Sequence, residues 1–267
     1  MSPFLSIVIP AYNEEQRIGP SLNEILQFLK QQTYSVEVIV VDDGSRDRTG
    51  KIVSDHVKQF EESSLQLRLL TNTPNRGKGY SVRRGVANAL GEIILFTDAD
   101  LSSPITEAPS LITPIAEGRA DVTFGSRAID RTLIAVRQSL LRDFGGRVFN
   151  LFMRAITGLP FKDTQCGFKA FRREAALPVF ERQSIERFGF DPEVLYIARK
   201  RGLRLLEVPV RWAHSEDSKV SYLRDSVQMF LDLARIRMND LKGKYDDASP
   251  VIEIEEEPSV EQVSKRP

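Results

Sequence analysis

The chain has 267 residues, of which 41% are hydrophobic and 28% charged, a composition typical of soluble globular proteins. Basic and acidic side chains number 37 each, so no excess of positive charge points to a protein that binds a nucleic acid polymer. One cysteine and two histidines exclude a disulfide framework within the chain and the common zinc ligand sets, and no apolar run approaches the roughly 18 residues of a membrane span. We therefore expect a soluble chain of the cytoplasm.

Acidic residues concentrate at the C-terminal end of the sequence. Residues 245–267 contain seven acids and two bases, which leaves 35 bases against 30 acids in residues 1–244. Apolar residues in the C-terminal segment mainly alternate with glutamate, and so short an acidic segment buries too little apolar surface to fold. We expect one folded domain over residues 1–244 and a disordered acidic tail over residues 245–267.

The first half of the chain alternates between strand-like and helix-like segments. Short apolar runs predict strands at Leu5–Pro10, Val36–Val41, Leu67–Thr71, Glu92–Thr97 and Asp121–Gly125. Helical spacing of apolar residues predicts helices that begin near Gly19 and cover Thr49–Phe60, Tyr80–Leu90 and Glu107–Glu117. Continuous apolar strands that are each followed by a helix indicate a Rossmann-like α/β fold, with a mostly parallel sheet covered by helices on both faces.

The second half is less regular, although it still predicts both kinds of element. We expect strands at Gly167–Phe171 and Leu203–Val210, and helices at Ser139–Ile156, Pro192–Lys200 and Ser221–Lys242. We expect these elements and those of the first half to form a single domain.

Unusual polar residues follow four of the predicted strands. They are Asn13, Glu14 and Glu15 after the first strand, Asp42–Ser45 after the second, Asp98–Asp100 after the fourth, and Ser126 with Arg127 after the fifth. Ligands of parallel α/β sheets bind beyond the carboxyl ends of the strands, so these clusters predict a site. Any one cluster could instead cap a helix, because Asp, Ser and Asn accept hydrogen bonds from unpaired helix amides.

Asp98-Ala99-Asp100 is the sharpest of these signals. Two carboxylates two residues apart on a turn repel each other unless a cation or a hydrogen-bond donor lies between them. Mg²⁺ and Mn²⁺ are commonly shared between such carboxylates and substrate phosphates. A solvated acidic loop is the alternative, and one carboxylate could also accept hydrogen bonds from a nucleotide or a sugar.

Asn75-Arg76-Gly77-Lys78-Gly79 places two cations between glycines just before a predicted helix. Glycine lets a ligand approach the backbone closely, and a helix N-terminus favours anions. The spacing matches neither a Walker A motif nor a dinucleotide-binding glycine pattern. Lys78 is therefore a candidate for binding an anionic substrate, with a turn of solvated cations as the alternative.

Seven motifs in this order resemble the glycosyltransferases of family 2, which have the GT-A fold. The motifs are Ile9–Glu14 (IPAYNE), Val41–Ser45 (VDDGS), Asn75–Gly79 (NRGKG), Asp98–Asp100 (DAD), Asp163–Lys169 (DTQCGFK), Phe190–Leu195 (FDPEVL) and Glu207–Trp212 (EVPVRW). The last three are similar to the polyprenyl-phosphate hexosyltransferase branch, first to the dolichyl-phosphate β-glucosyltransferases and next to the dolichol-phosphate mannose synthases. The resemblance extends over roughly residues 5–237.

The resemblance implies a nucleotide-sugar site and a divalent metal, Mg²⁺ or Mn²⁺. It assigns the nucleotide base and ribose to Pro10, Tyr12, Glu14, Val41 and Asp43. It places Asp98 and Ala99 against the nucleotide sugar and makes Asp100 the metal ligand. Ser102 stands where the mannose synthases commonly have a metal-binding Gln, so a neutral hydroxyl or a water would complete the metal shell.

The implied reaction transfers a hexose, with inversion, from a nucleotide sugar to a polyprenyl or dolichyl phosphate. The donor would be UDP-glucose, with GDP-mannose as the alternative. Arg127, Arg142 and Lys219 would face phosphate oxygens, and Asp191 would act as a base or contact a sugar hydroxyl unless it only begins a helix. A non-catalytic nucleotide-sugar-binding module is an alternative of another class, and a soluble acceptor is a further one.

Residues 139–156 also suggest contact with a membrane surface. Apolar side chains, among them Phe144 and Val148, form one face of the predicted helix, and Arg142, Arg147 and Arg154 flank it. Such a helix can lie at a bilayer interface beside anionic lipids, which would place the chain peripherally on the cytosolic face of a membrane. A helix that packs on the sheet with its arginines in water explains the pattern equally well.

Overall fold

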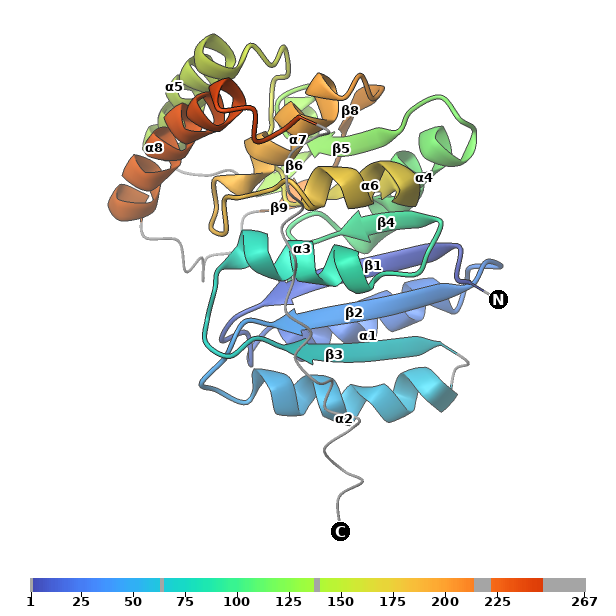
Figure 1. Ribbon diagram of the computed structural model, residues 1–267. Helices are drawn as coiled ribbons and strands as arrows, with labels where there is room; N and C mark the ends of the chain where they lie inside the picture. The colour runs from blue at the N-terminus through green and yellow to red at the C-terminus, as the bar shows by residue number, and fades with distance from the viewer. Residues whose placement is uncertain (1, 63–64, 137–139, 214–221, 247–267) are drawn as a thin grey trace.

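The computed structural model describes residues 2–62, 65–136, 140–213 and 222–246, which are built around a seven-stranded sheet (Figure 1). The strands are β1 (Leu5–Ala11), β2 (Val36–Asp42), β3 (Gln66–Thr71), β4 (Ile93–Phe96), β5 (Val122–Ser126), β7 (Lys169–Arg172) and β8 (Leu205–Pro209). Their order is β3-β2-β1-β4-β7-β5-β8. All pairs are parallel except those of β7, which runs antiparallel to both β4 and β5.

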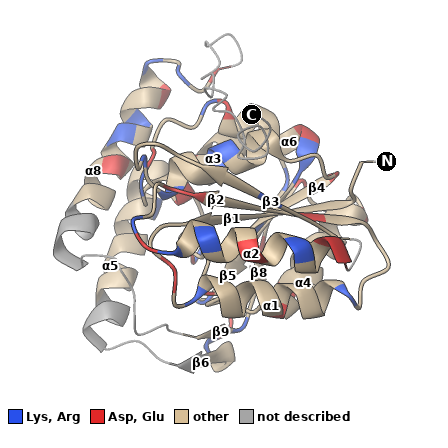
Figure 2. Cartoon of the chain, turned by 90° about the horizontal axis from the view of Figure 1, so that it is seen from below, with Lys and Arg blue, Asp and Glu red and all other residues tan. Residues whose placement is uncertain are grey.

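Helices cover both faces of the sheet, because the central strands are apolar on both sides. Ile7 of β1 belongs to one core cluster and Val8 to the other. The first cluster packs under α1 (Ile18–Leu29), α2 (Thr49–Glu62) and α4 (Ala108–Ala116), which follows the 3₁₀ turn Ile105–Glu107. The second packs under α3 (Lys78–Asn88), α6 (Arg173–Phe180) and α7 (Phe190–Lys200). Figure 2 shows α1, α2 and α4 together on one side of the sheet.

Two long helices, α5 (Leu140–Thr157) and α8 (Tyr222–Leu241), pack against each other on the side of the molecule where the parallel strands end (Figure 1). The ring of Phe230 on α8 meets Phe149 and Phe152 of α5 at centroid distances of 5.2 and 5.6 Å. A 3₁₀ turn, Arg131–Leu133, leads into β6 (Ile134–Val136), which pairs with β9 (Trp212–Ala213) in a second, two-stranded parallel sheet. None of the helices described is long and apolar enough to cross a membrane.

The predicted α/β fold with a mostly parallel sheet is confirmed, and the structure adds three features that were not predicted. The strand expected at Gly167–Phe171 is β7, which enters the sheet in the opposite direction to its neighbours. Helix α6 was not predicted, since Pro178 interrupts its eight-residue pattern. The small β6–β9 sheet was also missed, because its strands are too short to give a period-two signal.

The folded part continues past the boundary predicted at residue 244. Tyr245 is 1% exposed, and its hydroxyl donates to Oε1 of Glu193 at 2.7 Å. Its ring lies 6.0 Å from that of Tyr196. The first residue assigned to the acidic tail therefore packs in the core, and residues 247–267 lie outside the described residues.

Candidate active site

The loops that follow β1 and β2 are joined by hydrogen bonds. The backbone N–H of Asn13 donates to Oγ of Ser45 at 2.8 Å, and the N–H of Glu14 donates to Oγ1 of Thr49 at 2.7 Å. Asn13 has a φ of 53°, in the left-handed region that asparagine enters more readily than most residues. Short polar side chains of the β2 loop therefore fix the conformation of the β1 loop.

Four of the residues expected around the nucleotide base and ribose come together at this edge of the sheet. Pro10 and Val41 are buried register partners on β1 and β2, and Tyr12 is 38% exposed beyond the end of β1. Glu14 lies in the same loop, where its carboxylate binds the guanidinium of Arg17 at 2.6 and 2.7 Å. The grouping agrees with the sequence analysis, and contact with a nucleotide stays a prediction.

The carboxylate of Asp43, the fifth of those residues, accepts hydrogen bonds from other residues of the protein. Its Oδ1 accepts hydrogen bonds from Nδ2 of Asn72 at 2.7 Å and from the N–H of Arg76 at 3.0 Å. Its Oδ2 accepts from Nδ2 of Asn75 and from the N–H of Gly77, both at 2.7 Å. A carboxylate accepts about four hydrogen bonds, so the residues of this loop occupy the full hydrogen-bonding capacity of the Asp43 carboxylate. The structure gives Asp43 a role in shaping the loop before α3, and direct contact with the nucleotide stays a prediction.

Lys78, at the start of α3, lies among acidic side chains. Its Nζ forms an ion pair with Oδ1 of Asp98 at 2.6 Å. Burial by itself would lower the pKa of Lys78, but Asp98, Asp191 and Asp100 together raise it above its ordinary value. The cation before α3 and the acidic turn after β4 are therefore parts of one cluster. Figure 2 shows acidic and basic loop segments next to each other at this end of the sheet.

The Asp98–Asp100 turn is anchored on three sides. The carbonyl of Ala99 accepts a hydrogen bond from Oγ of Ser21 on α1 at 2.7 Å, so the backbone of Ala99 is anchored to this helix. The N–H of Ser102 donates to Oδ1 of Asp100 at 3.0 Å, and Nη1 of Arg17 lies 3.5 Å from Oδ2 of Asp100. These contacts hold the Asp100 carboxylate at the surface of the site.

The donor set at this turn fits a hard divalent cation. The side chains of Asp98 and Asp100 are 33% and 19% exposed, and both offer carboxylate oxygens. In the described part of the chain, no group of three or more His, Cys, Asp or Glu side chains could hold a metal by itself. Mg²⁺ and Mn²⁺ are commonly held by one or two carboxylates together with substrate phosphates, so Asp100 and a diphosphate would suffice. Ligation by the Ser102 hydroxyl stays a prediction.

Arg127, expected to face phosphate oxygens, is held by a buried carboxylate. Its Nε and Nη2 donate to Asp163 at 2.6 and 2.9 Å, and its guanidinium lies 5.4 Å from the centroid of the Trp212 ring. Burial would lower the pKa of Arg127, but the nearby Asp163 carboxylate raises it above its ordinary value. Burial would likewise raise the pKa of Asp163, but the Arg127 guanidinium lowers that pKa to about 2. The side chain is 28% exposed, so a charged guanidinium is presented in a fixed orientation.

Gly167, just before β7, allows the close approach of the Asp98 carboxylate. A Cβ added at position 167 would lie 2.3 Å from Oδ2 and 2.6 Å from Oδ1 of Asp98. No side chain larger than hydrogen fits there without moving Asp98. The glycine of the Asp163–Lys169 motif is therefore part of the site, a role that the sequence analysis did not assign.

Asp191 lies in the first turn of α7, which begins at Phe190 after the N-cap Gly189. Asp191 is therefore not the N-cap of this helix. It is 4% exposed and forms an ion pair with the fully buried Lys169 of β7. Lys169, like Arg17, Asp163 and Gly167, was missed as a site residue. For Asp163, Gly167 and Lys169 the available signal was their shared motif.

Two predicted phosphate-binding residues are not placed by the structure. Lys219 lies outside the described residues. Arg142 belongs to α5, whose backbone is described, but its side chain lies outside the described part, as does that of Arg147. Their contacts with phosphate stay predictions.

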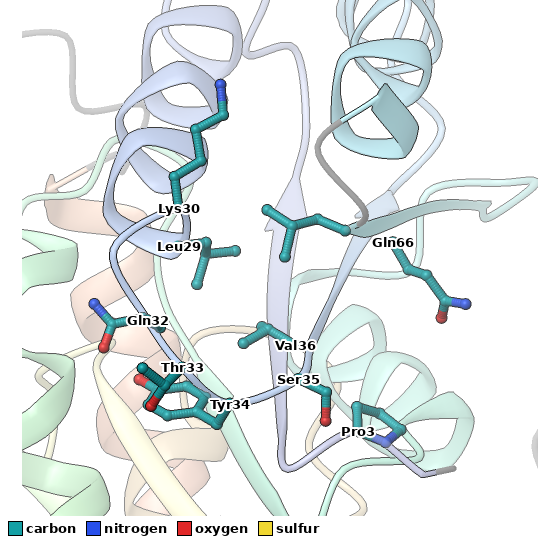
Figure 3. A pocket seen from close by; sticks show the side chains of 10 residues that line it. Pro3, Leu29, Lys30, Gln32, Thr33, Tyr34, Ser35, Val36 and Gln66 are labelled. Carbon is teal, nitrogen blue, oxygen red and sulfur yellow. The ribbon is translucent and has the colours of Figure 1, made fainter.

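A cavity of about 440 Å³ lies away from this cluster (Figure 3). It is lined by residues at the start of β1, β2 and β3 and by the end of α1, including Pro3, Lys30, Val36 and Gln66. Parallel strands place their carboxyl ends at the opposite edge, so the cavity and the acidic turn lie at different ends of the sheet. It contains none of the predicted site residues.

Comparisons with known proteins agree with the motifs. The sequence profile described as "Glycosyl transferase family 2" matches residues 6–180. Dolichyl-phosphate beta-glucosyltransferase of Dictyostelium discoideum is 36% identical over 250 residues, which cover 90% of this chain and 76% of that protein. The protein of the same name from Mus musculus is 38% identical over 253 residues, covering 90% and 77%.

Among solved structures, the fold is shared with glucosyl-3-phosphoglycerate synthase of Mycobacterium tuberculosis. Its complex with Mn²⁺, UDP and glucosyl-3-phosphoglycerate has a TM-score of 0.61 at 21% identity, and the match covers 88% of this chain and 80% of that chain.

Proposed function

Because the chain belongs to glycosyl transferase family 2, we propose that it transfers glucose from UDP-glucose to dolichyl phosphate or a related polyprenyl phosphate, with inversion at the anomeric carbon. The chain is a glycosyltransferase. The named donor and acceptor are supported by relatives called dolichyl-phosphate beta-glucosyltransferase, which align with 90% of it. The observation that carries the proposal is the cluster of Lys78, Asp98, Asp100 and Arg127 at the carboxyl edge of the sheet, where a nucleoside diphosphate would bring its charge.

The leaving group of this reaction is a nucleoside diphosphate, whose negative charge grows as the sugar departs. Lys78 and Arg127 are both within electrostatic reach of Asp98, so they bring two fixed cations to the same place. A divalent metal, Mg²⁺ or Mn²⁺, held by Asp100 would add positive charge to the diphosphate. Arg127 is preorganised by its two bonds to Asp163, so its orientation need not be established during the reaction.

The acceptor of this reaction needs charge compensation more than a base. A phosphate monoester has a second pKa near 6, so its oxygens are largely ionised at neutral pH. The two anionic substrates repel each other, and Arg142 and Lys219 would reduce that repulsion. Asp191 is then better suited to accept a hydrogen bond from a sugar hydroxyl than to remove a proton from the acceptor.

We place the membrane-facing surface on α5 and α8. Leu151 and Phe152 of α5 are 67% and 49% exposed, and Leu231 of α8 is 60% exposed. Arg154 and Arg235 are exposed on the same two helices. Apolar side chains flanked by arginines suit the boundary between acyl chains and anionic headgroups, and this surface lies on the side where the strands end. A lipid phosphate could thus reach the site from a cytosolic bilayer face.

A donor panel tests the proposed reaction. UDP-glucose, GDP-mannose and UDP-N-acetylglucosamine are each offered with dolichyl phosphate, with and without Mn²⁺. We expect transfer from UDP-glucose that requires the metal, and we expect Asp100→Asn to abolish it while leaving the melting temperature nearly unchanged. Transfer from GDP-mannose alone would contradict the assigned donor, and undiminished transfer by the variant would remove Asp100 as the metal ligand.

Vesicle sedimentation tests the membrane surface separately. We expect the full chain to sediment with vesicles that contain anionic lipid, and the double variant Leu151→Ser/Phe152→Ser to remain in the supernatant. Leu90→Ser is a matched control, since Leu90 is 53% exposed just beyond the C-terminal end of α3. Equal sedimentation of both variants would contradict the assignment of this surface.

A further inference from the structure

Lys169 is a fully buried lysine in the strand that completes the site. Its ammonium binds Oδ1 of Asp191 and donates to the carbonyl of Cys166 at 2.7 Å. It also lies 5.4 Å from the centroid of the Phe96 ring. A buried ammonium is costly unless its donors are satisfied, and here a carboxylate, a carbonyl and a ring face surround it. Lys169 is therefore held in one orientation.

The same contacts fix the carboxylate of Asp191. Within the described residues, no protein group donates to its other oxygen, Oδ2. The charge of this buried carboxylate is balanced by the ion pair with the buried Lys169 ammonium. An ionised carboxylate only accepts hydrogen bonds, and the hydroxyls of a hexose are donors.

Asp191 also lies on the donor side of the site. Asp191 is one of the carboxylates that raise the pKa of Lys78. The Nζ of Lys78 is 2.6 Å from Oδ1 of Asp98 and 5.9 Å from the ring centroid of Phe190. Phe190 immediately precedes Asp191 at the start of α7. The carboxylate fixed by Lys169 is thus in the cluster where the nucleotide sugar is expected.

We propose that Lys169 is a positioning residue for the donor: it binds Oδ1 of Asp191 so that Oδ2 accepts a hydroxyl of the transferred hexose. The proposal rests on the glucosyl transfer proposed above. UDP carries the nucleotide and diphosphate of the donor but no hexose. Loss of the Lys169–Asp191 pair should therefore weaken the binding of UDP-glucose while the binding of UDP stays as it was.

Calorimetric titration of UDP-glucose and of UDP in the presence of Mn²⁺ measures this difference. We expect Lys169→Met to weaken UDP-glucose binding at least tenfold and to change UDP binding less than twofold. Asp191→Asn should give the same pattern, because the amide oxygen can still accept from Lys169 while the ionised acceptor is lost. Lys200→Met is the matched control, since Lys200 ends α7 and pairs with Asp240 on α8. It should leave both affinities unchanged.

The variant Lys169→Met/Asp191→Asn separates positioning from folding, because it leaves no unpaired buried charge. We expect its melting temperature to exceed that of Lys169→Met and its preference for UDP-glucose over UDP to stay low. Wild-type preference in this double variant or in Asp191→Asn would overturn the proposal and leave the pair a purely structural one. If the wild-type chain binds UDP and UDP-glucose equally, or binds neither, the result contradicts the assignment of UDP-glucose as the donor rather than the role of Lys169.

Discussion

Asp43→Asn should destabilise the fold strongly, because each oxygen of the Asp43 carboxylate accepts two hydrogen bonds from residues 72–77. In either orientation the amide replaces one acceptor oxygen with an NH₂ group that faces two donors. A hydrogen bond to a charged group contributes about 1.5–3 kcal/mol, so losing two should cost about 3–6 kcal/mol of unfolding free energy. Urea unfolding followed by circular dichroism measures this loss.

Asp42→Asn is the matched control for that experiment. Asp42 is also buried at the end of β2, but its carboxylate accepts the N–H of Ser45 through Oδ1, which an asparagine can keep. We expect a loss below about 1 kcal/mol for this variant. If Asp43→Asn costs no more than the control while UDP affinity collapses, Asp43 contacts the nucleotide and the reasoning from its loop contacts is wrong.

Three further predictions concern the core and the acidic turn. Deleting residues 245–267 removes the buried Tyr245 ring and should lower the unfolding free energy by about 3–5 kcal/mol. Deleting only residues 247–267 should leave the melting temperature almost unchanged. Gly167→Ala should weaken UDP-glucose binding by displacing Asp98, and Gly146→Ala, which meets no atom within 4 Å, should not; equal effects in calorimetry would contradict this. Burial raises the pKa of Glu193 above its ordinary 4.5, so its stabilising contribution is complete below pH 4.5 and is lost as the pH rises through the folded value. Glu193→Gln should flatten that part of the pH profile in urea titrations.

The first half of the fold could be predicted because its sequence signals are local. Val36–Val41 is a continuous β-branched run, and such a run is typical of a buried parallel strand. The acidic turn at Asp98–Asp100 could be located as well, since polar residues after parallel strands must gather at the same edge of the sheet. These inferences need only periodicity and strand direction.

The remaining features depend on contacts between distant parts of the chain. Lys169 and Asp191 are far apart in sequence, and a lysine within a strand normally indicates a solvent-exposed position. The direction of β7 is set by its place between β4 and β5, which its few residues do not encode. Whether Asp43 binds a nucleotide or loop amides depends on how residues 72–77 fold around it.

The position of β7 has a consequence for how the chain acquires its fold during synthesis. β1 to β4 pair only with one another and with β7, so they can assemble in the order in which they leave the ribosome. β5 pairs with β7 and β8, both of which are made later, so one edge of β5 stays unpaired until Lys169–Arg172 has emerged and the other until Leu205–Pro209 has emerged. A nascent chain that ends before residue 167 carries the acidic turn but lacks both Gly167, against which Asp98 packs, and the Lys169–Asp191 pair, so its site is not yet assembled.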